Sequence, residues 1–269
     1  MSTVAQRSTP PRPIGDLLRE WRRHRRLSQL DLASGAEIST RHLSFMESGR
    51  AQPSRDMIVK LAEYLEIPLR ERNQLLMAAG FAPVYRERGM ADPALASVRD
   101  TMRLLLQGLE PYPALVVDRH WQLVDSNRAT QRLLAGLDPQ WLRPPINVLR
   151  LSLHPSGLAP FIRNLPAWRA HLLERLRCQI DATQDPELAE LLRELRSYPG
   201  GEATHTASPD AIAVPMELAV GDVVLSMLST TTVFGTPMDV TLAELALEAF
   251  VPADEATARQ LREMAESER

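Results

Sequence analysis

Apolar side chains recur at helical spacing through the first third of the chain and predict short amphipathic helices there. The spacing i, i+3, i+4, i+7 defines the first stripe, which consists of Ile14, Leu17, Leu18 and Trp21. Shorter stripes predict four more helices, with inward residues Leu30, Leu32 and Ala33; Leu43 and Met46; Ile58, Leu61, Ala62 and Leu65; and Leu69, Leu75, Leu76 and Ala79. Residues 14–80 are therefore expected to form an all-α bundle of five helices, after a disordered arm over residues 1–13.

A tight turn is predicted between the second and third helices. Ser28 and Ser39 are the expected N-caps, and Gly35 suits the left-handed conformation that ends a helix. A third helix of this size, presented by such a turn, fits the major groove of DNA. The residues expected on its outer surface, from which side chains reach base edges, are Thr40, Arg41, Ser44 and Phe45.

The run from Leu27 to Ser54, LSQLDLASGAEISTRHLSFMESGRAQPS, resembles the Xre family, the lambda-repressor/Cro-type helix-turn-helix. The shared features are the Ser-Gln pair, the glycine near the turn and the Leu-Ser-x-x-Glu-x-Gly-Arg ending. This resemblance implies phosphate contacts from Gln29, Ser39 and Arg50, and base contacts from the outer surface of the third helix. It also implies a structural role for Glu47 near the following turn. Some members of this fold bind proteins instead of DNA, so an antitoxin-like regulator remains an alternative.

Charge separates along the chain. Residues 1–90 contain 15 Arg/Lys and 10 Asp/Glu, whereas residues 91–269 contain 16 and 24. The basic part includes five arginines on the first helix, which form either a phosphate-facing surface or a solvated face: Arg19, Arg22, Arg23, Arg25 and Arg26. The net positive charge of the N-terminal part (the head) favours contacts with DNA phosphates. The net negative charge of the rest of the chain limits nonspecific binding to DNA.

The pattern changes after a predicted linker over residues 81–93. A helix is expected from Ala94 to Gln107, followed by two short strands and a helix, and then by two long amphipathic helices. The two short strands are expected at Ala114–Val117 and Trp121–Val124. After the long helices, three more strands are expected at Ala211–Val220, Asp222–Val233 and Val240–Phe250, and a final helix at Ala253–Glu266. Five strands with several helices predict an α+β domain over residues 94–269, and its β-β-α start looks like a PAS-type sensor.

Two further motifs resemble the MmyB-like transcription regulators. They are Arg-Asn-x-Leu-Leu-x-x-Ala-Gly at Arg72–Gly80 and Leu-x-x-His-Pro-x-Gly-Leu at Leu151–Leu158. Together with the Xre-type head they imply a chain whose second half is a PAS-like ligand-binding domain. The residues expected to line its pocket are Trp121, His154, Phe161, Trp168, Met227 and Phe234. For each, packing in a core, or a structural hydrogen bond for His154, is the alternative.

Catalytic and metal-binding patterns are weak. Asp118, His120 and Asp125 form the nearest cluster, but their positions fit turn geometry and helix capping. The single cysteine, Cys178, excludes an intrachain disulfide framework. No catalytic residue, metal ligand or cofactor is therefore expected. No apolar run approaches about 18 residues, so no membrane partner is expected and the chain is assigned to the cytoplasm.

The resulting hypothesis is a sequence-specific transcription regulator that is not an enzyme. Its expected partners are a double-stranded DNA operator, a second copy of the chain in a homodimer, and a small apolar, fatty-acyl-like ligand for which a fatty acid is a candidate. A DNA-binding head on an enzyme is a further alternative. That alternative requires a convergent nucleophile, an acid/base pair or a metal cluster.

Overall fold

The computed structural model describes residues 12–201 and 213–267, which divide into two compact units between Glu87 and Arg88. Most of the expected arm, residues 1–11, lies outside the described residues, as do the first two residues of the strand expected from Ala211. Each unit has its own apolar core.

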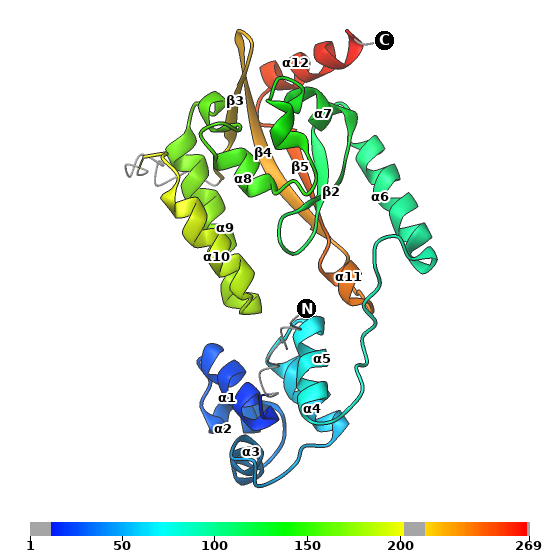
Figure 1. Ribbon diagram of the computed structural model, residues 1–269, viewed down its shortest axis with the longest axis vertical. Helices are drawn as coiled ribbons and strands as arrows, with labels where there is room; N and C mark the ends of the chain where they lie inside the picture. The colour runs from blue at the N-terminus through cyan, green and yellow to red at the C-terminus, as the bar shows by residue number, and fades with distance from the viewer. Residues whose placement is uncertain (1–11, 202–212, 268–269) are drawn as a thin grey trace, which may run out of the picture. The chain divides into compact units, whose positions relative to one another are not determined.

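The described part of the first unit is a bundle of five helices (Figure 1). These are α1 (Ile14–His24), α2 (Gln29–Gly35), α3 (Thr40–Glu47), α4 (Arg55–Tyr64) and α5 (Leu69–Ala78). Side chains that are completely inaccessible to solvent fill its centre: Leu18, Leu32, Leu43, Met46, Ile58 and Leu61. The expected all-α, lambda-repressor-like fold is confirmed.

Serine side chains begin three of these helices, as local sequence predicts. The hydroxyl of Ser28 accepts from the backbone N–H of Asp31, whose carboxylate accepts from the backbone of Ser28, which completes a capping box. Ser39 caps α3 and Ser54 caps α4 through the hydroxyl alone, which accepts from the backbone N–H of His42 and of Met57 respectively. The start of α3, and hence the direction of its side chains, is therefore set by residues adjacent to it in sequence.

Two expectations for α2 are wrong. Leu30 is 66% exposed, because it lies about 200° around the helix from Leu32 and cannot share its buried face. The left-handed residue in the turn is Glu37, with a φ of 51°, and not Gly35. An added Cβ at Gly35 would lie 2.0 Å from the ring of Tyr64, so glycine leaves room for the present position of that partly exposed side chain.

The second unit contains, in its described residues, a five-stranded antiparallel sheet with the order β2-β1-β5-β4-β3. Its strands are β1 (Ala114–Val117), β2 (Leu123–Ser126), β3 (Met216–Val220), β4 (Val223–Val233) and β5 (Ala246–Pro252). The strand expected at Val240–Phe250 begins instead with α11 (Val240–Ala243), whose first turn is capped by Asp239. That cap favours a helical turn over extended backbone.

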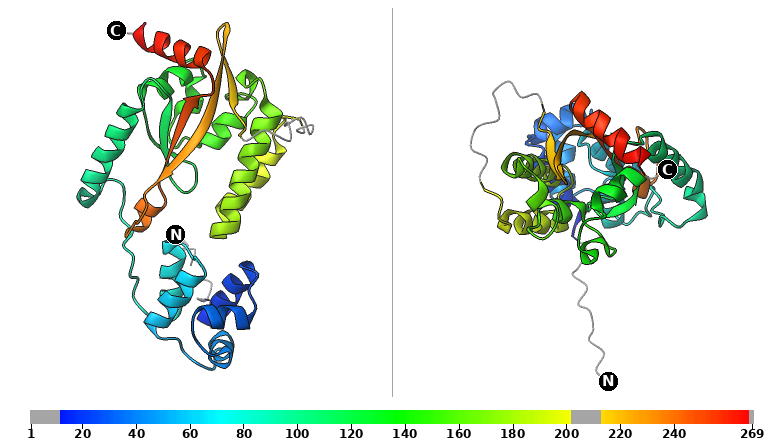
Figure 2. Two further views of the ribbon diagram at one scale, coloured as in Figure 1. Left: turned by 180° about the vertical axis from the view of Figure 1, so that it is seen from behind. Right: turned by 90° about the horizontal axis from the view of Figure 1, so that it is seen from above.

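Helices cover both faces of this sheet. They are α6 (Ala96–Gly108), α7 (Arg128–Leu134), α8 (Val148–Leu153), α9 (Leu165–Thr183), α10 (Pro186–Ser197) and α12 (Glu255–Glu266), with 3-10 turns at Pro93–Leu95, Pro139–Leu142 and Ala159–Phe161. α6 lies on one side of the sheet, and α9 and α10 lie on the other (Figures 1 and 2). The sheet order and the helices between β2 and β3 confirm the expected α+β, PAS-like fold.

Candidate functional site

The outward face of α3 carries the four residues expected to reach bases. Leu43, Met46 and Glu47 are the buried residues of this helix. Thr40, Arg41, Ser44 and Phe45 fall at i, i+1, i+4 and i+5 on the opposite side, where Arg41 is exposed and the other three are partly exposed. The structure thus brings these four side chains together on one helical face.

Two arginines flank the ring of Phe45 on this face. The guanidinium carbon of Arg41 lies 5.2 Å from the ring centroid, and that of Arg50 lies 6.0 Å from it. Both distances fall within the range of cation–π attraction. Arg50 follows Gly49, whose φ of 73° turns the chain back after α3. The arginine expected to bind phosphate therefore stands beside the side chains expected to read bases.

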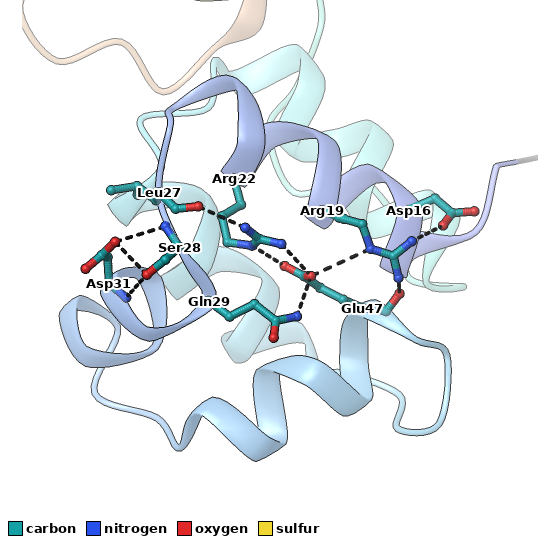
Figure 3. Close-up of polar contacts among 8 residues, drawn as sticks. All are labelled: Asp16, Arg19, Arg22, Leu27, Ser28, Gln29, Asp31 and Glu47. Carbon is teal, nitrogen blue, oxygen red and sulfur yellow. Dashed lines mark hydrogen bonds and ion pairs between the residues drawn. The ribbon is translucent and has the colours of Figure 1, made fainter.

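Behind this face, Glu47 is the centre of a buried polar network (Figure 3). It is 2% exposed. Its Oε1 accepts from Arg22 Nε at 2.6 Å, and its Oε2 accepts from Arg22 Nη2 at 2.9 Å and from Gln29 Nε2 at 2.8 Å. Arg19 donates to the backbone carbonyl of Glu47. The network joins α1 and α2 to the end of α3.

Desolvation by burial opposes ionisation of Glu47, but the hydrogen bonds and positive charges around it outweigh that effect. The bonds come from Arg22 and Gln29, and the charges belong to Arg22 and Arg19, so the pKa of Glu47 lies below its ordinary value. The hydrogen bond to Glu47 in turn raises the pKa of Arg22. The pair is therefore ionised at neutral pH.

These contacts change the interpretation of several residues. Arg22 had been a candidate for phosphate, yet it is 8% exposed and its Nη1 donates to the carbonyl of Leu27 at 2.8 Å. Arg22 lies at i+8 of the stripe that begins at Ile14, so helical spacing places it on the buried face, but no local pattern identifies Glu47 as its partner. Gln29 is held by Glu47, while Ser39 is exposed at the start of α3. Glu47 acts as a structural residue, but through α1 and α2 and not through the turn at Gly49.

The second unit contains a partly open cavity of about 90 Å³ between one face of the sheet and helices α7, α8 and α9. Its apolar lining includes Leu115, Leu123, Met216, Leu218 and Phe250 from the sheet, and Leu133, Val148, Leu149, Leu151 and Leu172 from the helices. Among the described residues, the polar side chains in the lining are those of Thr130, Ser152, Arg175, Ser229 and Glu248.

Two of the six residues expected to line a pocket do so. Trp121 and Trp168 both border the cavity, and both indole N–H groups are bonded: Nε1 of Trp121 donates to Gln179 at 2.7 Å, and Nε1 of Trp168 donates to Ser152 at 3.0 Å. Trp121 has a left-handed backbone, with a φ of 63°. This conformation costs about 1–3 kcal/mol for a residue other than glycine. Both indole rings are thus held in one orientation, and both contribute to the cavity lining.

The structure places the other four elsewhere. Met227 is fully buried in the core beside the cavity and is not part of its lining. Phe161 is 44% exposed, and Phe234 packs on the opposite face of the sheet. His154 packs against Trp141 and Tyr198, and its Nδ1 accepts from the backbone of Ser156 at 3.0 Å. The placements of Met227, Phe234 and His154 correspond to the core and structural alternatives, whereas the exposed Phe161 fits neither alternative.

A charged pair interrupts the apolar wall, and the sequence patterns did not identify it. Nη1 and Nη2 of Arg175 lie 3.0 and 2.8 Å from the two carboxylate oxygens of Glu248. Thr231 accepts from Nη2 at 2.9 Å and donates to the same carboxylate at 2.9 Å. Arg175 also lies 5.0 Å from the ring centroid of Trp121. The available signal was a glutamate on the inward side of an otherwise apolar strand.

Asp118 and His120 make hydrogen bonds that stabilise the fold. Oδ1 of Asp118 accepts from the backbones of His120 and Gln122 at 2.8 and 2.9 Å, which closes the turn between β1 and β2. Nε2 of His120 lies 2.9 Å from Asp185, the N-cap of α10. Among the described residues, no group of His, Cys, Asp and Glu is arranged to hold a metal ion. Over the same residues, no helix has the length and apolar character needed to span a membrane.

Comparisons with known proteins give two family matches. A model of the MmyB-like transcription regulator ligand binding domain matches residues 98–264, and a helix-turn-helix model matches residues 18–72. No curated protein matches the chain.

Among solved structures, the PAS domain from Bordetella pertussis BvgS is 15% identical with a TM-score of 0.27, over 64% of this chain and 98% of that one. An RNA-binding Light-Oxygen-Voltage receptor is 12% identical with a TM-score of 0.27, over 98% of this chain and 70% of that one. Such low TM-scores establish no shared fold, so the PAS-like description depends on the sheet order and helix positions given above.

Proposed function

The chain belongs to the MmyB-like transcription regulators, and on that premise we propose that it binds a specific DNA operator and senses a small apolar ligand. It is a DNA-binding transcription regulator with a ligand-binding domain. We assign operator binding to residues 14–80, with residues 81–93 as the linker. Ligand binding and homodimer formation are assigned to residues 94–269. The proposed activity is regulatory and not enzymatic, and it takes place in the cytoplasm.

The outward face of α3 is the observation that carries the DNA-binding proposal. Arg41 can bond O6 and N7 of guanine, Ser44 can bond several bases, and the Thr40 methyl and Phe45 ring suit the thymine methyl. Ser39 and Arg50 flank this face and are assigned to phosphates. Gln29 uses one amide N–H for Glu47, which leaves the second N–H for a phosphate oxygen.

One such head touches few base pairs, so useful affinity requires two heads on two half-sites. The test is selection of bound sequences from random DNA with the full-length protein. We expect enrichment of a paired site whose halves are separated by about one helical turn or a multiple of it. Recovery of unenriched random sequence would refute a sequence-specific operator. Enrichment of a single unpaired site would refute the dimer while leaving DNA binding intact.

The apolar lining supports a fatty-acyl-like ligand. It provides several aliphatic side chains and two tryptophan rings, and its few polar groups are mostly bonded within the protein. Such a ligand would alter operator binding only by favouring one arrangement of the heads over another. Calorimetric titration with decanol, decanoate and decanamide tests this class directly. We expect saturable binding of at least one, and binding of none would exclude it.

A cavity-filling variant locates the binding site. Leu123→Trp introduces a large side chain at a lining position that is only partly buried, and should abolish binding of the decanoyl compounds. Val224→Trp, at a position 48% exposed on β4, is the matched control and should bind them normally. Equal binding by the two variants would place the ligand outside this cavity.

A further inference from the structure

The ion pair between Arg175 and Glu248 in the cavity wall indicates which polar group a bound ligand would have. Arg175 on α9 and Glu248 on β5 both line the cavity, and each guanidinium Nη bonds one carboxylate oxygen. The side chain of Glu248 is only 4% exposed, and that of Arg175 is 25% exposed. The positive charge inside the cavity wall is therefore already matched by a buried negative charge.

The hydrogen-bonding capacity of the pair is not used up. A guanidinium group has five N–H donors, and the bonds to Glu248 and Thr231 use three of them. Within the described residues, no bond occupies the Nε–H or the second N–H of Nη1. Arg175 can thus donate to an oxygen atom of a ligand without releasing Glu248.

A histidine that interacts electrostatically with this pair does not change the charge balance. His171, also on α9, stacks on Trp168 with ring centroids 5.3 Å apart. Burial lowers the pKa of His171, and the charge of Arg175 lowers it further, although Glu248 acts in the opposite direction. His171 is consequently neutral at neutral pH. The polar end of the cavity, formed by Arg175 and Glu248, therefore has no net charge, and His171 adds none.

We propose that this polar end selects an acyl compound with an uncharged carbonyl head group, such as an amide or ester, over the free fatty acid. The inference rests on the acyl-ligand function proposed above and specifies its head group. A neutral carbonyl accepts from Arg175 and leaves the ion pair intact. A carboxylate would lie beside Glu248 in surroundings of low dielectric constant, where like charges repel strongly. It would bind only by gaining a proton or by displacing Glu248 from Arg175.

Paired ligands with one chain length provide the test. Calorimetric titration of the full-length protein at neutral pH compares decanamide with decanoate, which share the apolar tail. We expect decanamide to bind at least about tenfold more tightly, because only decanoate brings a second negative charge to the site. Tighter binding of decanoate would overturn this inference while leaving the acyl-ligand function standing. Binding of neither would overturn both.

Glu248→Gln removes the negative charge beside Arg175 and keeps nearly the same side-chain shape. Arg175 then lacks its negative partner, so decanoate should bind at least about tenfold more tightly than it does to the unmodified protein, with decanamide nearly unchanged. Glu174→Gln, on the exposed side of α9, is the matched control and should alter neither affinity. No gain for decanoate in Glu248→Gln would overturn the proposed role of Glu248.

A measurement on the unmodified protein covers the case in which Glu248→Gln does not fold. If the cavity accepts only the uncharged acid, the affinity for decanoate should rise about tenfold for each unit of pH decrease until the acid's own pKa is reached. The affinity for decanamide, measured in parallel, accounts for any titration of the protein itself. A decanoate affinity that does not rise relative to that of decanamide would overturn the inference.

Discussion

Both units contain a bidentate arginine–glutamate pair that joins elements distant in sequence, yet the two pairs differ in their surroundings. Glu47 is enclosed by Arg22, Gln29 and Arg19 in the head. Glu248 pairs with Arg175 at the edge of a cavity. The first pair is buried among other bonded side chains, whereas the second borders a cavity. The same two residue types therefore hold helices together in one unit and present a polar group in the other.

Removing Glu47 should have the largest effect. Glu47→Ala leaves the buried guanidinium of Arg22 without its counter-charge, which should destabilise the first unit by about 3–5 kcal/mol. Hydrogen exchange of the α1–α3 amides in the full-length protein measures this. Glu37→Ala, which removes an exposed partner of Lys60, is the control and should cost less than about 1 kcal/mol.

A double variant sharpens this result. Replacement of both charges, as Arg22→Met with Glu47→Leu, removes the unpaired buried charge and should restore most of the lost stability. If the double variant is no more stable than Glu47→Ala, the unpaired charge is not the cause of the loss.

The lowered pKa of Glu47 makes the stability of the first unit depend on pH. Because this pKa is lower in the folded state than in the unfolded state, the pair's contribution is complete above the ordinary glutamate pKa and is lost as the pH falls through the folded-state value. Acid should therefore destabilise the unmodified first unit more than the Arg22→Met, Glu47→Leu variant. Hydrogen exchange at a series of acidic pH values measures the difference, and parallel pH profiles would contradict it.

Arg41 represents an arginine with a different environment, since it is exposed and contacts Phe45 instead of a carboxylate. Arg41→Ala should reduce discrimination between operator and random DNA by about 1–3 kcal/mol, because a base contact is lost. Fluorescence anisotropy with both DNAs measures this. Equal losses on the two DNAs would show that Arg41 does not read bases.

Arg50 should give the smallest change in specificity. Arg50→Ala should weaken binding to operator and random DNA similarly and reduce the slope of log affinity against log salt by about 1, as expected for one lost phosphate contact. Anisotropy titrations over a range of salt concentrations test this. An unchanged slope would assign Arg50 to packing against Phe45 and not to phosphate.

Local features were predictable from the sequence. The stripes of α1 and α3–α5, the serine caps and the outer face of α3 follow from residues within a few positions of one another. Leu30 shows the limit of this approach: being apolar, it was assigned inward, although its angle around α2 directs it to solvent. Arg22 shows a second limit: its spacing from Ile14 places it on the buried face of α1, but nothing near it in the sequence identifies Glu47 as its partner.

The sequence by itself determined the two kinds of domain, the helix-turn-helix and the face that α3 presents, because helix periodicity and capping act over short distances. Tertiary structure alone decided which charges are paired and which side chains border the cavity. Arg22 and Glu47 are separated by 25 positions, and Arg175 and Glu248 by 73. The cavity lining comes from strands and helices spread through the second unit. These ion pairs and this lining depend on how helices and strands pack together. The spacing of residues along a single element does not reveal that packing.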